Sequence, residues 1–333
     1  METSPRKICY GIIGFGSFAE RAVAPAIAAS RNSRLVAIQK RSLATAEEKA
    51  REHSIPYAFD SAQELVRHPE VDAVYIASAN ACHCEETLVA AKAGKHVLVE
   101  KPMATDAAEC RRMIAACKRH GVKLMVGHML RFSPLIFRMR NIVRSGMIGD
   151  IVTARSEFVY DGRLSQRQWL LKRKLAGGGP VFDIGVHGLD TLRFVLDDEV
   201  VSTKSDLLPH PTANSTEQKA NLLLRFSRGV LATMSCSFVA PFRRTFLEFV
   251  GTNGIISAFS FTQNNATVYL NITMGKEGKA EPTRTEEVVV PNLYIEQISS
   301  FSDNILENTE TLIGGEVGLK NQIVLDAAMS SVR

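Results

Sequence analysis

The stretch that decides the fold is ICYGIIGFGSFA, residues 8–19. Its first six residues are mostly apolar and predict a buried parallel strand, and the Ala-rich stretch that follows predicts a helix. Between the two stands the pattern G-x-G-x-x-A. Gly14 permits a tight turn, Gly16 lets the backbone approach a pyrophosphate, and Ala19 allows close packing of helix on strand. Glycines alone can serve geometry only, but this strand–turn–helix context predicts a dinucleotide site.

Strands and helices then alternate as far as Val126. Two capping boxes, Thr45-x-x-Glu48 and Ser61-x-x-Glu64, predict helix starts. Alternation of this kind predicts right-handed crossovers and a parallel sheet covered by helices on both faces. We therefore expect residues 1–126 to form a doubly wound Rossmann domain that binds a dinucleotide. The expected strands after the first are 35–38, 55–59, 71–77, 97–99 and 122–126.

The end of the second predicted strand bears on the choice of nucleotide. A chain that binds NAD places Asp or Glu there, about 20 residues after the glycines, on the ribose 2′-hydroxyl. This chain has Gln39, Lys40, Arg41 and Ser42 instead. Two cations and a hydroxyl suit a 2′-phosphate, so we predict NADP(H), with NAD possible. The alternative is a solvated basic pair that precedes the next helix.

Three stretches occupy the carboxyl ends of predicted strands, where ligands of parallel sheets bind: Gly14–Ser17, Ser78–His83 and Glu100–Pro102. Lys101 therefore faces the expected cofactor edge. An ammonium there can hydrogen-bond a substrate oxygen and stabilise developing alkoxide charge. Glu100 could accept ribose hydroxyls. The alternative for Lys101 is a surface cation after a turn.

A second constellation lies in AGGGPVFDIGVH, residues 176–187. Residues 182–196 read as a helix, on which Asp183 and His187 are four residues apart and share a face. A carboxylate and an imidazole presented together suit proton transfer. The alternatives are a capping Asp with a surface His, or a metal site. A third ligand is not evident, and we expect no metal.

From about Asp150 the pattern becomes rich in β-strands with hairpin turns. We expect residues 127–333 to form a second α/β domain with a meandering, antiparallel sheet. One face of this sheet should pack on helices such as 182–196, and a partner subunit could cover the other. The stretch 275–284 reads as a polar loop. The expected strands are 151–158, 220–226, 230–238, 245–250, 255–259, 267–273 and 287–290.

Composition excludes several classes of protein. A length of 333 residues with 45% hydrophobic residues suits two domains with a large core. The net charge of +5 is spread along the chain, so we expect no nucleic-acid binding. No apolar run is long enough for a membrane span. The six cysteines follow no disulfide pattern and indicate a reducing cytoplasm, and Cys82-His83-Cys84 is a poor zinc site.

These motifs resemble the glucose–fructose oxidoreductase / inositol dehydrogenase / rhizopine-catabolism (Gfo/Idh/MocA) oxidoreductases. The resemblance runs from about residue 7 to 331, and the Lys-Pro stretch is its most specific part. Ala79 departs from the usual Pro before Asn80, and Met129 and Leu130 depart from the usual polar or aromatic residues. The matching stretches are 14–16, 77–83, 93–102, 127–132, 177–187 and 318–331.

The resemblance implies a Rossmann domain and an α/β domain with a large, mostly antiparallel open sheet. It implies a nicotinamide cofactor, a sugar, polyol or related cyclic substrate, and a homo-oligomer, dimer or tetramer, formed through the C-terminal sheet. Lys101 would be the catalytic lysine, with Asp183 and His187 in substrate binding and proton transfer and with Arg131 and Trp169 as further substrate contacts. The expected cofactor contacts are Gly14, Phe15, Gly16, Ser17, Phe18, Lys40, Arg41, Ser42, Ser78, Asn80, His83, Glu100 and Lys101.

The sequence thus predicts an NADP(H)-dependent oxidoreductase that acts on a sugar-like hydroxyl or carbonyl group. Carbonyl reduction is the favoured direction, because cellular NADP is largely reduced. One alternative is a non-catalytic, cofactor-binding regulator, which the joint presence of Lys101, Asp183 and His187 disfavours. The other is a glycosidase that oxidises its substrate transiently with tightly held NAD, which Lys40 and Arg41 disfavour.

Overall fold

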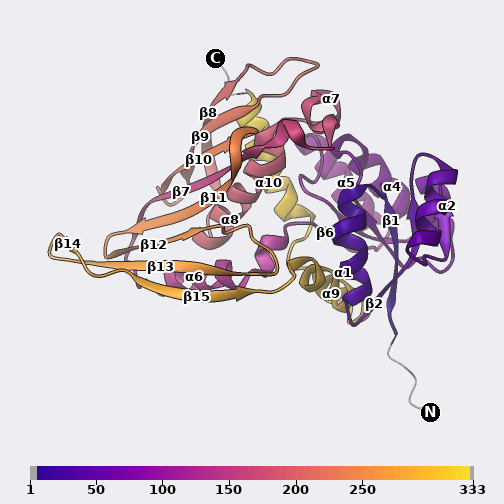
Figure 1. Cartoon of the computed structure of the whole chain (residues 1–333), viewed down its shortest axis with the longest axis horizontal. Coiled ribbons are helices and arrows are strands. Elements are labelled where there is room, and N and C mark those ends of the chain that lie inside the picture. Colours follow the sequence, from indigo (N-terminus) through magenta and orange to yellow (C-terminus); the bar gives the residue numbers. More distant parts are fainter. Residues whose placement is uncertain (1–5, 331–333) are drawn as a thin grey trace, which may run out of the picture. The chain divides into compact units, whose positions relative to one another are not determined.

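The computed structural model describes residues 6–330, which form two compact units. One unit runs as far as Gly127 and also contains Tyr294–Gln322. The other comprises His128–Leu293 and the chain from Ile323 onward. Figure 1 labels the helices and strands of both. Among the described residues, no helix is long and apolar enough to cross a membrane.

The first unit is built on a six-stranded sheet in the order β3-β2-β1-β4-β5-β6. Every neighbouring pair in it is parallel, as predicted. The central strands are buried on both faces, which explains their near-continuous apolar sequences. The strands are β1 (Ile8–Ile13), β2 (Ser33–Gln39), β3 (Tyr57–Phe59), β4 (Ala73–Ile76), β5 (His96–Val99) and β6 (Leu124–Val126).

Three helices of this unit, α2, α3 and α5, start at a residue whose side chain accepts from a free backbone amide. Ser61 accepts from the amide of Glu64, so the predicted cap of α3 is confirmed. The predicted cap of α2 at Thr45 is wrong, because Ser42 accepts from the Thr45 amide and the helix starts three residues earlier. The helices are η1 (Ala19–Val23), α1 (Ala24–Ala29), α2 (Leu43–Glu52), α3 (Ala62–Arg67), η2 (Asn80–Cys82), α4 (His83–Lys92) and α5 (Ala107–Arg119).

Helix α9 (Leu293–Leu306) packs on this parallel sheet, although the sequence division assigned it to the second domain. The hydroxyls of Tyr10 and Ser302 lie 2.8 Å apart, and the Asn32 amide donates to the carbonyl of Ser299 at 2.9 Å. These long-range polar contacts fix the helix to β1 and to the start of β2. Helix α10 (Gly315–Ser330) follows it.

The second unit contains a nine-stranded sheet in the order β14-β13-β12-β11-β7-β10-β9-β8, with β15 paired to β13. Its pairs are antiparallel except β7 with β10, so the prediction of a mostly antiparallel sheet is confirmed. The strands are β7 (Ile151–Asp161), β8 (Val200–Leu208), β9 (Lys219–Phe226), β10 (Leu231–Ser237), β11 (Val239–Gly251), β12 (Gly254–Phe259), β13 (Ala266–Lys276), β14 (Lys279–Ala280) and β15 (Arg284–Val290).

Two features of this sheet differ from the prediction or refine it. The stretch 275–284, expected to be a loop, is a β-hairpin in which Gly275 pairs with Ala280. Burial alternates strictly along β9, so one face of the sheet is buried and the other is exposed.

Helix α8 (Val186–Leu196) packs on the buried side against β7, and α6 (Pro134–Arg144) packs on α8. The short helices here are η3 (Met129–Phe132), η4 (Gly162–Leu164), η5 (Gln168–Leu171), α7 (Arg173–Ala176) and η6 (Val181–Gly185).

Candidate active site

The glycine turn after β1 has the geometry of a phosphate-binding loop. Gly14 has φ of +77°, and a Cβ on it would lie 2.7 Å from the backbone of Ser78. Any side chain at Gly14 would therefore push apart the ends of β1 and β4. Gly16 is exposed, and within the described chain a Cβ there would meet nothing closer than 3.9 Å. Packing does not require glycine at this position, whereas approach of a ligand would.

Gln39, at the end of β2, holds this turn in place. Its side-chain oxygen accepts from the Gly14 amide at 3.1 Å, and its carbonyl accepts from the Phe15 amide at 2.9 Å. The Lys40 ammonium donates to the Phe15 carbonyl at 2.8 Å, whereas Arg41 is exposed. Lys40 thus braces the turn, and Arg41 is the more accessible cation. The sequence placed Gln39 at this edge but assigned it no role.

The start of the following helix, η1, has no side-chain cap within the described residues, and Phe18 occupies its N-cap. Uncapped amides at a helix start favour an anion. Three of the predicted cofactor contacts have partners within the protein: Phe15 is buried with its ring 5.8 Å from that of His53, Phe18 packs on the Tyr294 ring, and Ser42 caps α2. Ser17, by contrast, is half-buried beside Gly16.

His83 is fully buried and links two loops of the cofactor edge. Its Nδ1 lies 3.1 Å from the carbonyl of Pro102, and its Nε2 lies 3.3 Å from that of Ser78. Burial lowers the pKa of His83 to about 4, so the imidazole is neutral. A neutral imidazole has a single N–H and donates to only one of these two carbonyls. We therefore revise the predicted role of His83: it packs between the two loops and supports them, instead of contacting a ligand itself. Asn80, in the same turn, is also buried.

The turn after β5 carries Lys101, which is half-buried and precedes a cis peptide bond to Pro102. Glu100 is directed inward. Its carboxylate accepts from the Tyr75 hydroxyl at 2.6 Å and from the Lys101 amide at 3.2 Å. The Gln297 amide of α9 donates to the same tyrosine at 3.4 Å. In these contacts Glu100 braces the backbone that presents Lys101.

Glu86 lies below the same edge and accepts from the Ser78 hydroxyl at 2.5 Å. Burial raises its pKa from 4.5 to about 7. A carboxyl group whose folded pKa is raised stabilises the fold fully below about pH 4.5, and this contribution is lost as the pH rises through 7. At pH 8 the protein therefore holds an unfavourable buried charge.

Replacing Glu86 with glutamine should raise the free energy of unfolding at pH 8 and leave it unchanged at pH 4.5. The full shift corresponds to about 3 kcal/mol, which partial exposure reduces to about 2 kcal/mol. Urea unfolding at the two pH values measures the difference. Glu85→Gln is the matched control. Glu85 is exposed, and its carboxylate pairs with Arg112 at the surface. An equal gain at both pH values would contradict the assignment.

In the second unit, Asp183 is 3% exposed and anchors a cluster that the sequence did not reveal. The Arg167 guanidinium donates to its carboxylate through two bonds of 3.0 Å, and the Tyr160 hydroxyl donates at 3.1 Å. Asp183 lies in the π-helical turn η6 and not in the predicted regular α-helix. Such turns are frequent at functional sites, because they displace a side chain from the helical register.

His187 lies on the first turn of α8 and is half-buried, with its ring 6.2 Å from that of Phe158. Gly188 behind it is required by packing, since a Cβ there would lie 2.2 Å from the Ser156 hydroxyl. The close contact presses α8 onto β7. Trp169, also half-buried, is carried by the separate turn η5.

Arg131 occupies a different position from the one the sequence suggested. It is buried, and its guanidinium donates to both oxygens of Asp190 at 2.9 and 3.0 Å. The ring of Phe194 packs on its guanidinium carbon at 4.9 Å. These contacts commit Arg131 to holding α8 on η3. Its predicted contact with substrate has no support from this geometry.

Two protein-family models match the chain. The model described as "Oxidoreductase family, NAD-binding Rossmann fold" covers residues 8–128. The model of the GFO/IDH/MocA C-terminal domain covers residues 136–257. The two matches coincide with the glycine turn, the Lys101 stretch and the strands around Asp183.

Relatives agree over most of the chain. The 1,5-anhydro-D-fructose reductase of Ensifer adhaerens is 36% identical over 93% of this chain and 92% of its own. The trans-1,2-dihydrobenzene-1,2-diol dehydrogenase of Mus musculus is 35% identical over 62% of this chain and 61% of its own. The crystal structure of an aldose-aldose oxidoreductase from Caulobacter crescentus, complexed with glycerol, has a TM-score of 0.86 and 29% identity, and the similarity covers 98% of this chain and 97% of that one.

Sequence, architecture and relatives thus agree. The structure has a parallel sheet with a glycine turn and a large open sheet. Its relatives are named for the reduction or oxidation of sugars and diols, and both findings indicate the same family. The chain belongs to the Gfo/Idh/MocA family of oxidoreductases and is an NAD(P)-binding enzyme that acts on CH–OH groups.

Proposed function

We propose that this enzyme uses NADPH to reduce the carbonyl group of a sugar or a related cyclic compound. The observation that carries the proposal is the place of Lys101. It follows β5, which pairs with β4, and β4 pairs with β1, the strand that ends at the glycine turn. The lysine therefore stands at the carboxyl edge where parallel sheets of this kind bind their cofactors.

The proposed roles follow from the chemistry of each group. A bound nicotinamide cofactor supplies the hydride. Lys101 hydrogen-bonds the substrate oxygen and stabilises the charge that develops on it. His187 donates the proton, and Asp183 orients both the substrate and the imidazole. Arg167 and Tyr160 keep the Asp183 carboxylate in one position, as their three hydrogen bonds indicate.

The substrate class is tested by a panel of aldoses, ketoses and polyols that includes 1,5-anhydro-D-fructose, the compound named for one relative. Loss of the reduced nicotinamide absorbance in the presence of a keto sugar would support the proposal. Release of a free sugar without net cofactor oxidation would instead support glycosidase chemistry. Absence of both reactions across the panel would leave a cofactor-binding regulator as the better account.

NADPH should bind at least about 10-fold more tightly than NADH, because a charge-assisted bond to the 2′-phosphate contributes about 1.5–3 kcal/mol. Arg41 is exposed, whereas the Lys40 ammonium already binds the Phe15 carbonyl. Arg41→Ala should therefore remove most of the preference and leave NADH affinity unchanged. Dissociation constants for both nucleotides, measured by fluorescence titration, test this.

Arg51→Ala is the matched control for Arg41→Ala. Arg51 is also an exposed arginine and lies at the other end of α2, where its guanidinium donates to the Glu47 carbonyl. Its loss should leave both dissociation constants unchanged. If wild-type protein binds NADPH no more tightly than NADH, the choice of NADP(H) is refuted.

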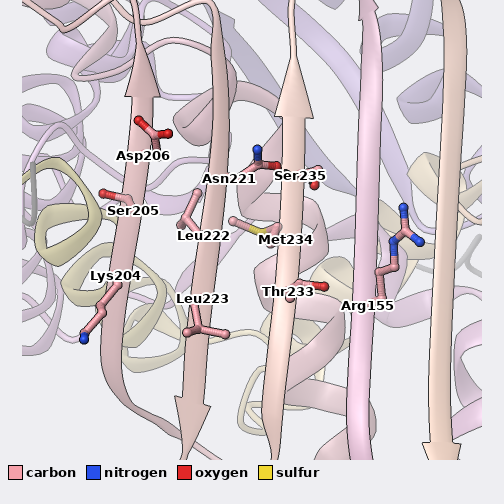
Figure 2. A pocket seen from close by; sticks show the side chains of 10 residues that line it. All are labelled: Arg155, Lys204, Ser205, Asp206, Asn221, Leu222, Leu223, Thr233, Met234 and Ser235. Carbon is pink, nitrogen blue, oxygen red and sulfur yellow. Dashed lines mark hydrogen bonds between the residues drawn. The ribbon is translucent and has the colours of Figure 1, made fainter.

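We also propose that a second copy of the chain covers the exposed face of the large sheet. The pairing registers place the exposed apolar side chains of five strands, β9, β10, β12, β13 and β15, on this face. A hollow of about 520 Å³ lies on this face. Figure 2 shows its lining, with Lys204 and Asp206 on one strand, Arg155 on the far side and Asn221 between them. Exposed apolar area rimmed by both signs of charge suits self-association. The apolar residues are Leu223, Leu231, Ile255, Phe259, Tyr269 and Val289.

Wild-type protein should therefore be a dimer or tetramer by light scattering, and Leu223→Glu combined with Phe259→Glu should halve its mass or reduce it further. Both side chains are about half exposed, so the carboxylates disrupt a partner contact without entering the core. Leu312→Glu, which places a charge at an equally exposed site outside the sheet, should leave the mass unchanged. A monomeric wild-type protein would contradict the proposal.

We further propose that the enzyme works in a reducing compartment such as the cytoplasm. All six cysteines are free thiols in the structure. Four of them are buried, and a buried thiol packs as a small apolar group. Disulfide-free chains of this size are typical of reducing compartments.

A further inference from the structure

The segment between β8 and β9 contains two buried polar residues that the sequence did not assign to any site. Thr216 is 3% exposed and Glu217 is 0% exposed. Neither belongs to the helix that carries Asp183 and His187, yet both contact the segments that lead into the site. These contacts indicate that Thr216 and Glu217 hold those segments in place.

Glu217 caps the start of η6, although it is distant from this helix in the sequence. One carboxyl oxygen accepts from the Gly179 amide at 2.9 Å and from the Val181 amide at 3.1 Å. The first amides of a helix have no partner inside the helix. Pro180 occupies the N-cap of η6 and offers no side-chain acceptor. Glu217, from the segment that leads into β9, supplies the acceptor that this local sequence lacks.

The glycines before the helix make this contact possible. A Cβ on Gly179 would lie 2.1 Å from the carbonyl oxygen of Glu217 and 3.1 Å from the Thr216 side chain. A Cβ on Gly178 would lie 2.4 Å from the ring of Phe182. Both glycines are therefore required by close packing, and the triple-glycine stretch serves to dock the helix start against Thr216 and Glu217.

Thr216 holds a second segment of the site. Its hydroxyl donates to the carbonyl of Leu170 at 3.1 Å, inside the turn η5 that carries Trp169. Two adjacent residues thus fix the turn of Trp169 and the helix of Asp183. Arg167, just before the same turn, completes the connection through its paired bonds to Asp183.

We infer that Glu217 is a positioning residue, whose carboxyl oxygen fixes the start of the helix that presents Asp183 and His187 to the substrate. This inference rests on the proposed function of those two residues. The second oxygen of Glu217 has no hydrogen-bond partner among residues 6–330. A buried unpaired oxygen costs free energy, so the site keeps Glu217 at the expense of stability.

The charge of Glu217 is a separate matter from its hydrogen bonds. Burial raises its pKa, while the two amides and the positive charge of Arg173 lower it. The Cys236 thiol faces the same carboxyl group from β10, and its own pKa is raised by burial and by Glu217. A neutral glutamine keeps the acceptor and removes the charge, so the two contributions can be separated by substitution.

The experiment compares Glu217→Gln with Glu217→Leu. The glutamine variant should keep kcat within about 3-fold, because its amide oxygen still accepts from both backbone amides. The leucine variant should lower kcat by at least about 30-fold, because a displacement near 1 Å at the reacting groups can cost about 100-fold. NADPH affinity should be unchanged in both. If the leucine variant does not fold, Glu217→Asp replaces it. Its side chain is one methylene shorter, so we expect a loss of kcat that is smaller than in Glu217→Leu.

Asp198→Leu is the matched control. Asp198 is a largely buried carboxylate just past the other end of α8, where it accepts from the amides of Glu199 and Arg228 at 2.7 and 3.0 Å. Its loss should lower the melting temperature without lowering kcat. An equal loss of kcat in Asp198→Leu and Glu217→Leu would show a general effect of destabilisation and would overturn the inference.

Hydrogen–deuterium exchange of residues 178–190 gives a readout that does not depend on activity. Exchange should be at least about 10-fold faster in Glu217→Leu than in wild type or Glu217→Gln, since the capped amides lose their acceptor. Unchanged exchange in Glu217→Leu would overturn the inference even if the wild type is an active reductase. If the wild type shows no reductase activity but exchange is still faster in Glu217→Leu, the anchoring by Glu217 is upheld and only the proposed function is refuted.

Discussion

Replacing Lys101 with alanine is expected to lower kcat by at least about 1,000-fold, because both the hydrogen bond to the substrate oxygen and the positive charge beside it are lost. NADPH affinity should stay within about 3-fold of wild type, since the glycine turn and Arg41 are untouched. Stopped-flow single turnovers separate the chemical step from product release. Fluorescence titration gives the affinity for the nucleotide.

Lys95→Ala is the control for this variant. Lys95 precedes β5, whereas Lys101 follows it, so the two lysines stand at opposite ends of one strand. The Lys95 ammonium donates to the carbonyls of Val71 and His68 at 2.6 and 3.3 Å, at the amino edge of the sheet. Its loss should reduce stability and spare turnover. A near-normal kcat in Lys101→Ala would refute the catalytic role of that lysine.

Asp183→Ala is expected to reduce kcat/KM by at least about 100-fold and the free energy of unfolding by about 3 kcal/mol. The carboxylate is almost fully buried, and its removal leaves the Arg167 guanidinium and the Tyr160 hydroxyl without their shared acceptor. Both the orientation of the site and the local packing therefore suffer. Steady-state kinetics and urea unfolding at one pH measure the two effects.

Asp161→Ala provides the comparison, because Asp161 also binds an arginine through paired bonds, of 2.8 and 2.9 Å to Arg163. That pair is at the surface, where such bonds contribute at most about 1 kcal/mol. Its loss should leave kcat/KM within about 2-fold. Equal kinetic losses in the two aspartate variants would show that the buried position of Asp183 has no special importance.

Much of the fold could be predicted because its signals are local. The strand–turn–helix at Gly14 and the alternation up to Val126 specify the parallel sheet, and both follow from patterns within a few residues. The start of α2 could not be predicted, because Ser42 and Thr45 are both acceptable caps and only the fold selects one. The return of α9 to the first unit depends on contacts such as Tyr10 with Ser302, which no local pattern encodes.

The residues of the candidate site also fall into those that local patterns reveal and those that only the fold reveals. Lys101, Asp183 and His187 stand in motifs that the sequence displays, whereas their supports come from distant segments. Arg167 precedes Asp183 by 16 residues, and Glu217 follows Gly179 by 38. A basic residue in a loop and an acid before a strand are common, so neither carries a signal of its role. A buried acid next to glycines that tolerate no Cβ becomes recognisable only in three dimensions.

The central claim is that hydride passes from NADPH to a substrate carbonyl with the help of Lys101. Its most direct test uses NADPH that carries deuterium at the transferable C4 position, with a keto sugar as substrate, and follows the product by mass spectrometry. We predict one deuterium atom on the reduced carbon for each NADPH oxidised, and a rate of labelled product formation at least about 1,000-fold lower with Lys101→Ala. Product without deuterium, or labelled product formed by Lys101→Ala at the wild-type rate, would contradict the account.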